Sequence, residues 1–141
     1  MLSKEFHNSI PTDKFLVFQT DVITFKPLDK KFLEYDYIGA PWKKELHADY
    51  RAEVGNGGLS IRSKLAMLKI ISQNIPRLKN QPEDLYLAQI LKKQNFHVAS
   101  YESAKEFATE DVFNLNTFGC HKSWELIKFV ELKQLLSQLA K

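Results

Sequence analysis

Four titratable side chains stand where the chain could form a ligand site. Asp21 follows a short apolar run, so its carboxylate would lie at the end of a strand and could bind a divalent cation. Glu83 and Asp84 are adjacent acids, either of which could contact sugar hydroxyls or serve as a general base. His121 carries an imidazole that could ligate a metal. Each has an ordinary alternative: a turn aspartate, acids that stabilise the first turn of a helix, and a solvated loop histidine.

Glycines concentrate in one segment between these residues. The chain has five glycines, and Gly55, Gly57 and Gly58 fall within four positions. Glycine permits close backbone approach, and a glycine loop joined to a strand is a frequent place for a ligand. The spacing matches neither the dinucleotide fingerprint nor the phosphate-binding P-loop. Asn56 is the one side chain at this turn that both donates and accepts hydrogen bonds.

Two further side chains border the predicted loops. Trp42 follows Pro41 beside a polar segment, where an aromatic face could stack on a sugar, although core packing is its usual role. Lys122 follows His121 and could meet a phosphate. The single cysteine, Cys120, excludes an intrachain disulfide and has no neighbour that marks it as a nucleophile.

Short strands alternate with helices in the predicted order of elements, which favours an α/β fold. Strands are predicted at 15–18, as in a buried parallel strand, and at 22–25, 35–39, 59–62 and 96–99. Residues 43–53 are polar and predict a loop. Helices are predicted from a Ser63 cap to about Asn74, from Pro82 onward, after a capping box at Ser103 and Glu106, and as an amphipathic helix over 124–139 that docks on the core.

Length and composition predict one domain over residues 1–141. Hydrophobic residues make up 44% of the chain, which suffices for a core. The net charge of +3, from 20 basic and 17 acidic side chains, is too even to indicate nucleic acid binding. No apolar run approaches the ~20 residues that span a bilayer, and the first residues lack a signal-peptide pattern. We therefore expect a cytoplasmic protein without a membrane span.

Five segments in order resemble the motifs of an uncharacterised glycosyltransferase-like family, which is similar to the GT-A class of nucleotide-sugar glycosyltransferases. They are Phe18-Gln19-Thr20-Asp21, Tyr35-Asp36-Tyr37-Ile38-Gly39-Ala40-Pro41-Trp42, Val54-Gly55-Asn56-Gly57-Gly58-Leu59-Ser60-Ile61-Arg62, Glu83-Asp84 and Phe118-Gly119-Cys120-His121-Lys122-Ser123-Trp124. Their order and spacing, from about residue 13 to 124, make the resemblance specific. It implies a partial GT-A-like mixed sheet flanked by helices.

The resemblance also implies residue roles. Asp21 and His121 would bind a divalent cation, Mn²⁺ or Mg²⁺, although Gln19 stands where a D-x-D motif has its first acid. Lys122 would neutralise the leaving diphosphate. The segment 55–58 would shape the pocket for the acceptor and the donor sugar. One of the two acids at 83–84 would meet the acceptor hydroxyl, as the base of an inverting displacement.

The implied function is transfer of a sugar from a nucleotide-sugar donor to a sugar or protein acceptor. Only about 20 residues precede Asp21, so we expect this chain to lack the N-terminal nucleotide-binding half of a GT-A fold, as a natural short form, a fragment or half of a split or oligomeric enzyme. A sheet edge left exposed in this way would favour a homo-oligomer. The alternatives are a non-catalytic carbohydrate- or partner-binding module and a purely structural domain. An enzyme requires Asp21, Asn56, Asp84 and His121 to share one cleft.

Overall fold

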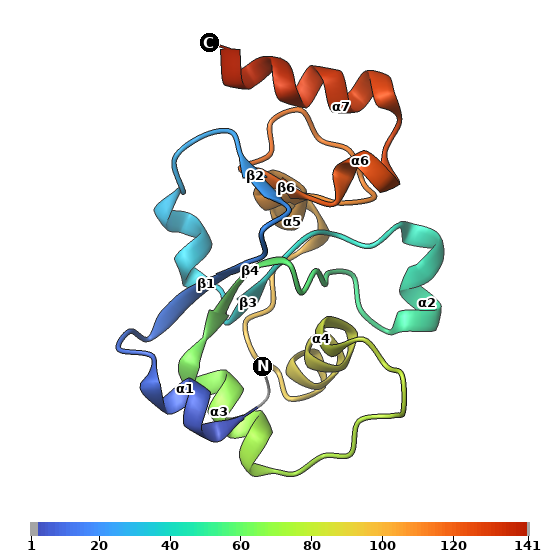
Figure 1. Ribbon diagram of the computed structural model, residues 1–141. Helices are drawn as coiled ribbons and strands as arrows, with labels where there is room; N and C mark the ends of the chain where they lie inside the picture. Colours follow the sequence, from blue (N-terminus) through green and yellow to red (C-terminus); the bar gives the residue numbers. More distant parts are fainter. Residues whose placement is uncertain (1–2, 141) are drawn as a thin grey trace.

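Six short strands form two sheets in this computed structural model, which describes residues 3–140 (Figure 1). The strands are β1 (Lys14–Phe18), β2 (Val22–Thr24), β3 (Tyr37–Ile38), β4 (Leu59–Ser63), β5 (Ala108–Thr109) and β6 (Gly119–His121). The first sheet has the order β1-β4-β3 and is antiparallel throughout. The second has the order β2-β6-β5, with β2 antiparallel and β5 parallel to β6. A mixed α/β fold is confirmed at this level.

Helices flank both sheets. The α-helices are α1 (Lys4–Ser9), α2 (His47–Tyr50), α3 (Lys64–Ser72), α4 (Glu83–Lys93), α5 (Tyr101–Phe107), α6 (Ser123–Leu126) and α7 (Phe129–Leu136). Short 3-10 helices are η1 (Lys30–Glu34), η2 (Lys44–Leu46) and η3 (Ser137–Ala140). Two apolar cores result, because β3 turns Tyr37 toward α3 and α4 and Ile38 toward the aromatic cluster of Phe32, Phe107 and Phe118.

Strand β1 differs from its prediction. It pairs antiparallel with β4 at the edge of the first sheet, and only Val17 of the strand is buried. Phe18 is 67% exposed. The continuous apolar run suggested burial on both faces, but it is the neighbouring strand β4 that is buried along its whole length, Ser60 and Arg62 included. β4 lies between two partners, β1 and β3, which pair with its backbone on both sides.

The helix starts follow local capping. Ser63 caps α3 as predicted, because its Oγ accepts a hydrogen bond from the Ala66 backbone N–H at 3.3 Å. The residue at the N-cap of α4 is Pro82, so Glu83 and Asp84 occupy the first turn, where the helix dipole favours carboxylates. The short helix begins earlier than predicted, since Ser100, and not Ser103, is the N-cap of α5.

Two other segments also differ. Residues 96–99 form no named strand, and Val98 makes only an isolated parallel bridge with Tyr37. The polar segment 43–53, predicted as a loop, contains η2 and α2. Both segments are too short for periodicity alone to decide between a strand, a helical turn and a loop.

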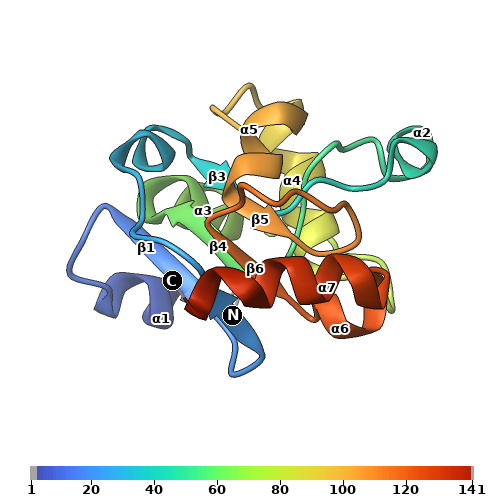
Figure 2. The same cartoon turned by 90° about the horizontal axis from the view of Figure 1, so that it is seen from above.

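The C-terminal amphipathic helix is interrupted. The backbone of Ile127 is extended, which ends α6 before α7 begins. Leu135 is the buried side chain of α7, whereas Phe129 is 71% exposed. α7 lies at the end of the molecule opposite α3 and runs along one side of it (Figure 1; Figure 2). Continuous docking of 124–139 on the core, as predicted, is therefore wrong.

Candidate functional site

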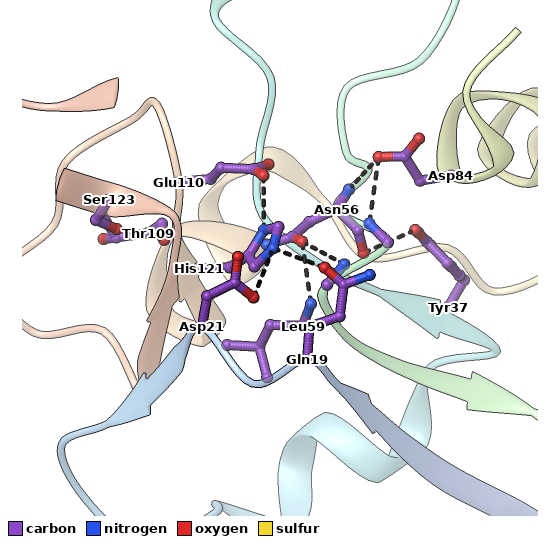
Figure 3. Close-up of polar contacts among 12 residues, drawn as sticks. Gln19, Asp21, Tyr37, Asn56, Leu59, Asp84, Thr109, Glu110, His121 and Ser123 are labelled. Atoms are coloured by element: carbon purple, nitrogen blue, oxygen red, sulfur yellow. Dashed lines mark hydrogen bonds and ion pairs between the residues drawn. The ribbon is translucent and has the colours of Figure 1, made fainter. Parts of the chain in front are cut away.

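His121 is the buried centre of a polar cluster between the two sheets (Figure 3). Its Nδ1 lies 2.9 Å from Glu110 Oε1. Its Nε2 lies 3.1 Å from Gln19 Oε1 and 3.4 Å from Asp21 Oδ1. The side chain of His121 is only 7% exposed, whereas that of Asp21 is 25% exposed and Gln19 is exposed, so water reaches one side of the cluster.

Strand register explains why these groups meet. His121 on β6 pairs with Val22 of β2, and Asp21 immediately precedes that residue. On the other side of β6, Cys120 pairs with Thr109 of β5, and Glu110 follows directly. The two carboxylates therefore reach the imidazole from opposite neighbours of one central strand.

The two ring nitrogens of His121 face different groups. A carboxylate oxygen accepts hydrogen bonds, so Nδ1–H donates to Glu110 Oε1. Nε2 faces two oxygens, those of Gln19 and Asp21. A proton or a cation at Nε2 would be stabilised by these two oxygens.

The glycine loop is fixed by side chains from both ends. Asn56 has a φ of 78°, and its Oδ1 accepts hydrogen bonds from the backbone N–H groups of Gly58 at 2.8 Å and Leu59 at 3.0 Å. The Oδ2 of Asp84 accepts from the backbone N–H groups of Asn56 at 3.0 Å and Gly57 at 3.2 Å. Because Asp84 stands in the first turn of α4, this helix positions the loop.

The glycines have different neighbours. A Cβ on Gly58 would lie 2.1 Å from His121 Nε2, so the loop backbone presses directly on the imidazole. A Cβ on Gly55 would lie 2.2 Å from the Trp42 ring. A Cβ on Gly57 would come no closer than 3.8 Å to Asp84, which is an ordinary contact. Packing thus accounts for the glycine at two positions but not at Gly57.

Glu83 is committed to a buried arginine. Arg62 is 1% exposed, and its Nη1 donates to Glu83 Oε1 at 2.7 Å while its Nε donates to Ser60 Oγ at 3.1 Å. Burial raises the pKa of Glu83, but the hydrogen bond and positive charge of Arg62 contribute to a net pKa below the ordinary value. Glu83 is therefore a carboxylate that balances a buried charge, and its catalytic role stays a prediction.

Tyr37 links the first core to the loop. Its hydroxyl donates to the Asn56 carbonyl at 3.5 Å, and the guanidinium of Arg62 lies 5.9 Å from its ring centre. Burial raises the pKa of Tyr37, so the hydroxyl stays protonated and remains a donor.

The other predicted ligand residues lie outside the polar cluster. Trp42 packs against Gly55 and makes an edge-to-face contact with Tyr50 at 5.1 Å. Lys122 is exposed, has a φ of 50° and makes no ion pair or side-chain hydrogen bond within residues 3–140. Their ligand roles stay predictions. Glu110 is a site residue that the sequence did not predict. It directly follows β5, and a strand of two residues is too short to be recognised from the sequence.

Several buried polar atoms have no hydrogen-bond partner. Among the described residues they include Asp21 Oδ1 in the polar cluster, Asn56 Nδ2 in the glycine loop and Arg62 Nη2 on β4. Such atoms are rare in native interiors unless a ligand, ion or water satisfies them.

Within the described part of the chain, no three histidine, cysteine or acidic side chains form a metal-binding group. A cation at Asp21 and His121 would therefore need oxygens from Gln19, water or a bound diphosphate, the partial coordination typical of Mg²⁺ and similar ions at phosphate sites.

No helix within the described residues is long and apolar enough to cross a membrane.

The chain was compared with known proteins. No curated protein and no solved structure matches it. A family model matches residues 1–121, a range that includes the polar cluster and ends just before Lys122. By this match the chain belongs to the family described as "Protein of unknown function (DUF5672)".

Proposed function

We propose that this chain is a glycosyltransferase-type domain that transfers a sugar from a nucleotide-sugar donor to a sugar or protein acceptor. One observation carries the proposal: the buried His121 Nε2 faces the oxygens of Asp21 and Gln19 and lies against Gly58 of the glycine loop. The same loop contains Asn56, whose backbone N–H donates a hydrogen bond to Asp84 (Figure 3). A charge-binding end, at His121, therefore adjoins a hydroxyl-binding end, at Asn56 and Asp84.

The charge-binding end suits a divalent cation carried by a diphosphate. Asp21 and His121 would supply a carboxylate oxygen and an imidazole nitrogen, with Gln19 as a further oxygen donor. Glu110 holds His121 through Nδ1, which is the usual outer-shell partner of a metal-binding histidine. A cation here would offset the charge that develops on the leaving diphosphate.

The hydroxyl-binding end suits a sugar. Asn56 Nδ2 is a buried donor without a protein partner, and Gly57 leaves room beside it. Of the two adjacent acids, Asp84 is the better candidate to meet an acceptor hydroxyl, because Glu83 neutralises Arg62. The mixed strand directions and the aspartate after β1 support a partial GT-A-like sheet as part of this proposal.

A non-catalytic carbohydrate-binding module is the second candidate. The hydrogen bonds of Asp84 favour this candidate. Its Oδ2 already accepts from two backbone N–H groups of the glycine loop, and its Oδ1 accepts from the backbone N–H of Leu85 in α4. A carboxylate held in this way has fewer lone pairs left to accept a hydrogen bond from an acceptor hydroxyl.

Turnover separates the two candidates. The protein is incubated with a panel of nucleotide sugars and Mn²⁺, and release of nucleoside diphosphate is measured for the wild type, Asp21→Asn, Asp84→Asn and the control Asp13→Asn. Asp13 is an exposed acid outside the cluster. Release that is lost in the first two variants and kept in the control supports the transferase. Saturable sugar-nucleotide binding without release supports the module, and neither binding nor release contradicts both.

A further inference from the structure

Two adjoining cavities, of about 520 and 600 Å³, lie along α4, and neither is lined by a residue of the polar cluster. They share Arg51, Leu78, Gln81 and Gln89, so they form one continuous depression, which we call the basic groove. Its walls come from the end of α2, from α4 and from the long segment that joins α3 to α4 (Figure 1).

The floor of the basic groove is apolar. It is built from Ile75, Pro76, Tyr86 and Ile90. Leu78 stands at its edge with 74% of its surface exposed, although nothing in the fold requires an exposed leucine there. A single exposed leucine is ordinary, but one at the edge of an apolar depression of this volume is typical of a binding surface.

The rim is strongly cationic. Four basic side chains line the groove against one acid, Asp49: they are Arg51, Lys79, Lys92 and Lys93. This local surplus equals the +3 net charge of the whole chain. Within residues 3–140, Lys92 reaches Glu53 at 3.5 Å, while the other three basic residues make no ion pair. The charge is thus available to a partner.

Hydrogen bonds hold the groove open. The Tyr86 hydroxyl donates to the Ile75 carbonyl at 2.7 Å, which ties the joining segment to α4. The Gln89 side chain donates to the Tyr50 carbonyl at 2.6 Å and accepts from Gln81 at 2.9 Å, which ties all three walls together. A preformed site loses less conformational entropy when a partner binds.

We propose that the basic groove docks an acidic polypeptide segment that carries apolar side chains. An apolar residue of the segment would enter the depression while neighbouring carboxylates meet the rim cations. A bilayer surface is flat and would not fill a concavity of this size, and a nucleic acid would leave the apolar floor without contacts. Pro82 and Leu85 line the groove and flank Asp84, so a docked segment would lead toward the proposed site. The docking does not depend on the transferase activity.

A random peptide display library, selected on the folded wild-type protein, tests this directly. Selected peptides are synthesised with a fluorophore, and their binding is followed by anisotropy. Leu78→Ser removes the apolar edge, and the double change Arg51→Glu with Lys79→Glu reverses the rim. Lys4→Glu with Lys30→Glu is the matched control, since both are exposed lysines away from the groove. Thermal melts establish that each variant is folded.

We expect the selected peptides to combine aspartate or glutamate with leucine or an aromatic residue. Their affinity should fall about tenfold or more, or about 1.4 kcal/mol, in Leu78→Ser and in the rim variant, and change less than about twofold in the control. Peptides without acidic enrichment, or an equal loss in the control, would overturn the proposal. So would groove-dependent binding of vesicles rich in phosphatidylserine together with no binding of the selected peptides.

Discussion

Gly58 lies directly against the imidazole of His121: a Cβ placed on Gly58 would be 2.1 Å from Nε2. This contact joins the glycine loop of the first sheet to the central strand of the second. It also closes one side of the histidine, so that the remaining approach to Nε2 is shared by Gln19 and Asp21. The position of the loop and the environment of His121 are therefore coupled.

Substitution of alanine at two neighbouring glycines should separate packing from ligand binding. Gly58→Ala forces His121 or the loop to move, and we expect a loss of about 2 kcal/mol in the free energy of unfolding. Gly57→Ala would place its Cβ in ordinary contact with Asp84 at 3.8 Å, and the φ of Gly57 is not positive, so stability should change by less than about 1 kcal/mol. Chemical denaturation measures both.

The same pair carries a functional expectation. If the open side of Gly57 holds a sugar, Gly57→Ala should weaken nucleotide-sugar binding about tenfold or more while the protein stays folded. A Gly57→Ala variant with unchanged binding would show that the ligand does not contact this face of the loop.

Glu110 should affect metal binding without touching the metal. Glu110→Gln removes the carboxylate that holds His121 Nδ1, and we expect Mn²⁺ affinity to fall roughly tenfold. His121→Ala should abolish Mn²⁺ binding. Electron paramagnetic resonance of free Mn²⁺ during titration gives both affinities. Full Mn²⁺ affinity in His121→Ala would place the ion elsewhere.

Acid pH should weaken the fold partly through Glu83. Its folded pKa lies below the ordinary 4.5, so its contribution to stability is present above that value and is lost as pH falls through the lower folded pKa. Glu83→Gln leaves Arg62 with a weaker partner and should cost roughly 2 kcal/mol at neutral pH. The difference from the wild type should shrink below pH 4.5, as followed by thermal melts. A difference that is independent of pH would mean that the ion pair does not stabilise the fold.

Asp84 should matter to stability as well as to any chemistry. Asp84→Ala leaves the N–H groups of Asn56 and Gly57 without their acceptor, and we expect a loss of about 2 kcal/mol. Asp84→Asn keeps one acceptor oxygen and should cost about half as much. Asp13→Ala is the control, because Asp13 is exposed and its side chain makes no contact of this kind. Equal melting temperatures for all three would remove the positioning role of Asp84.

Much of the site could be predicted from local sequence. The serine cap of α3, the acids in the first turn of α4 and the strand after the glycines follow from short-range patterns, and the structure has all three. The proximity of Asp21 and His121 also agrees with the prediction, since their side chains lie 3.4 Å apart.

The remaining features depend on contacts between distant residues. Glu110 reaches His121 only because β5 pairs with β6, and a strand of two residues leaves no periodic signal. Glu83 forms an ion pair with Arg62, which is buried. The alternating sequence of β4 predicts that Arg62 points to solvent, so this ion pair could not be predicted. β1 reads as buried because its apolar run is continuous, yet its place in the sheet is set by pairing order.

Ligand-dependent thermal stability is the most direct test of the proposed site. Melting temperatures are compared for the wild type and Asp21→Asn against a panel of nucleoside diphosphates and nucleotide sugars, with and without Mn²⁺. At a ligand concentration about 100 times Kd, binding to the native state adds about 2.7 kcal/mol. We predict that at least one nucleotide sugar stabilises the wild type in a Mn²⁺-dependent manner and that Asp21→Asn loses this effect. A panel without any shift, or an equal shift in Asp21→Asn, would contradict a metal–diphosphate site at Asp21 and His121.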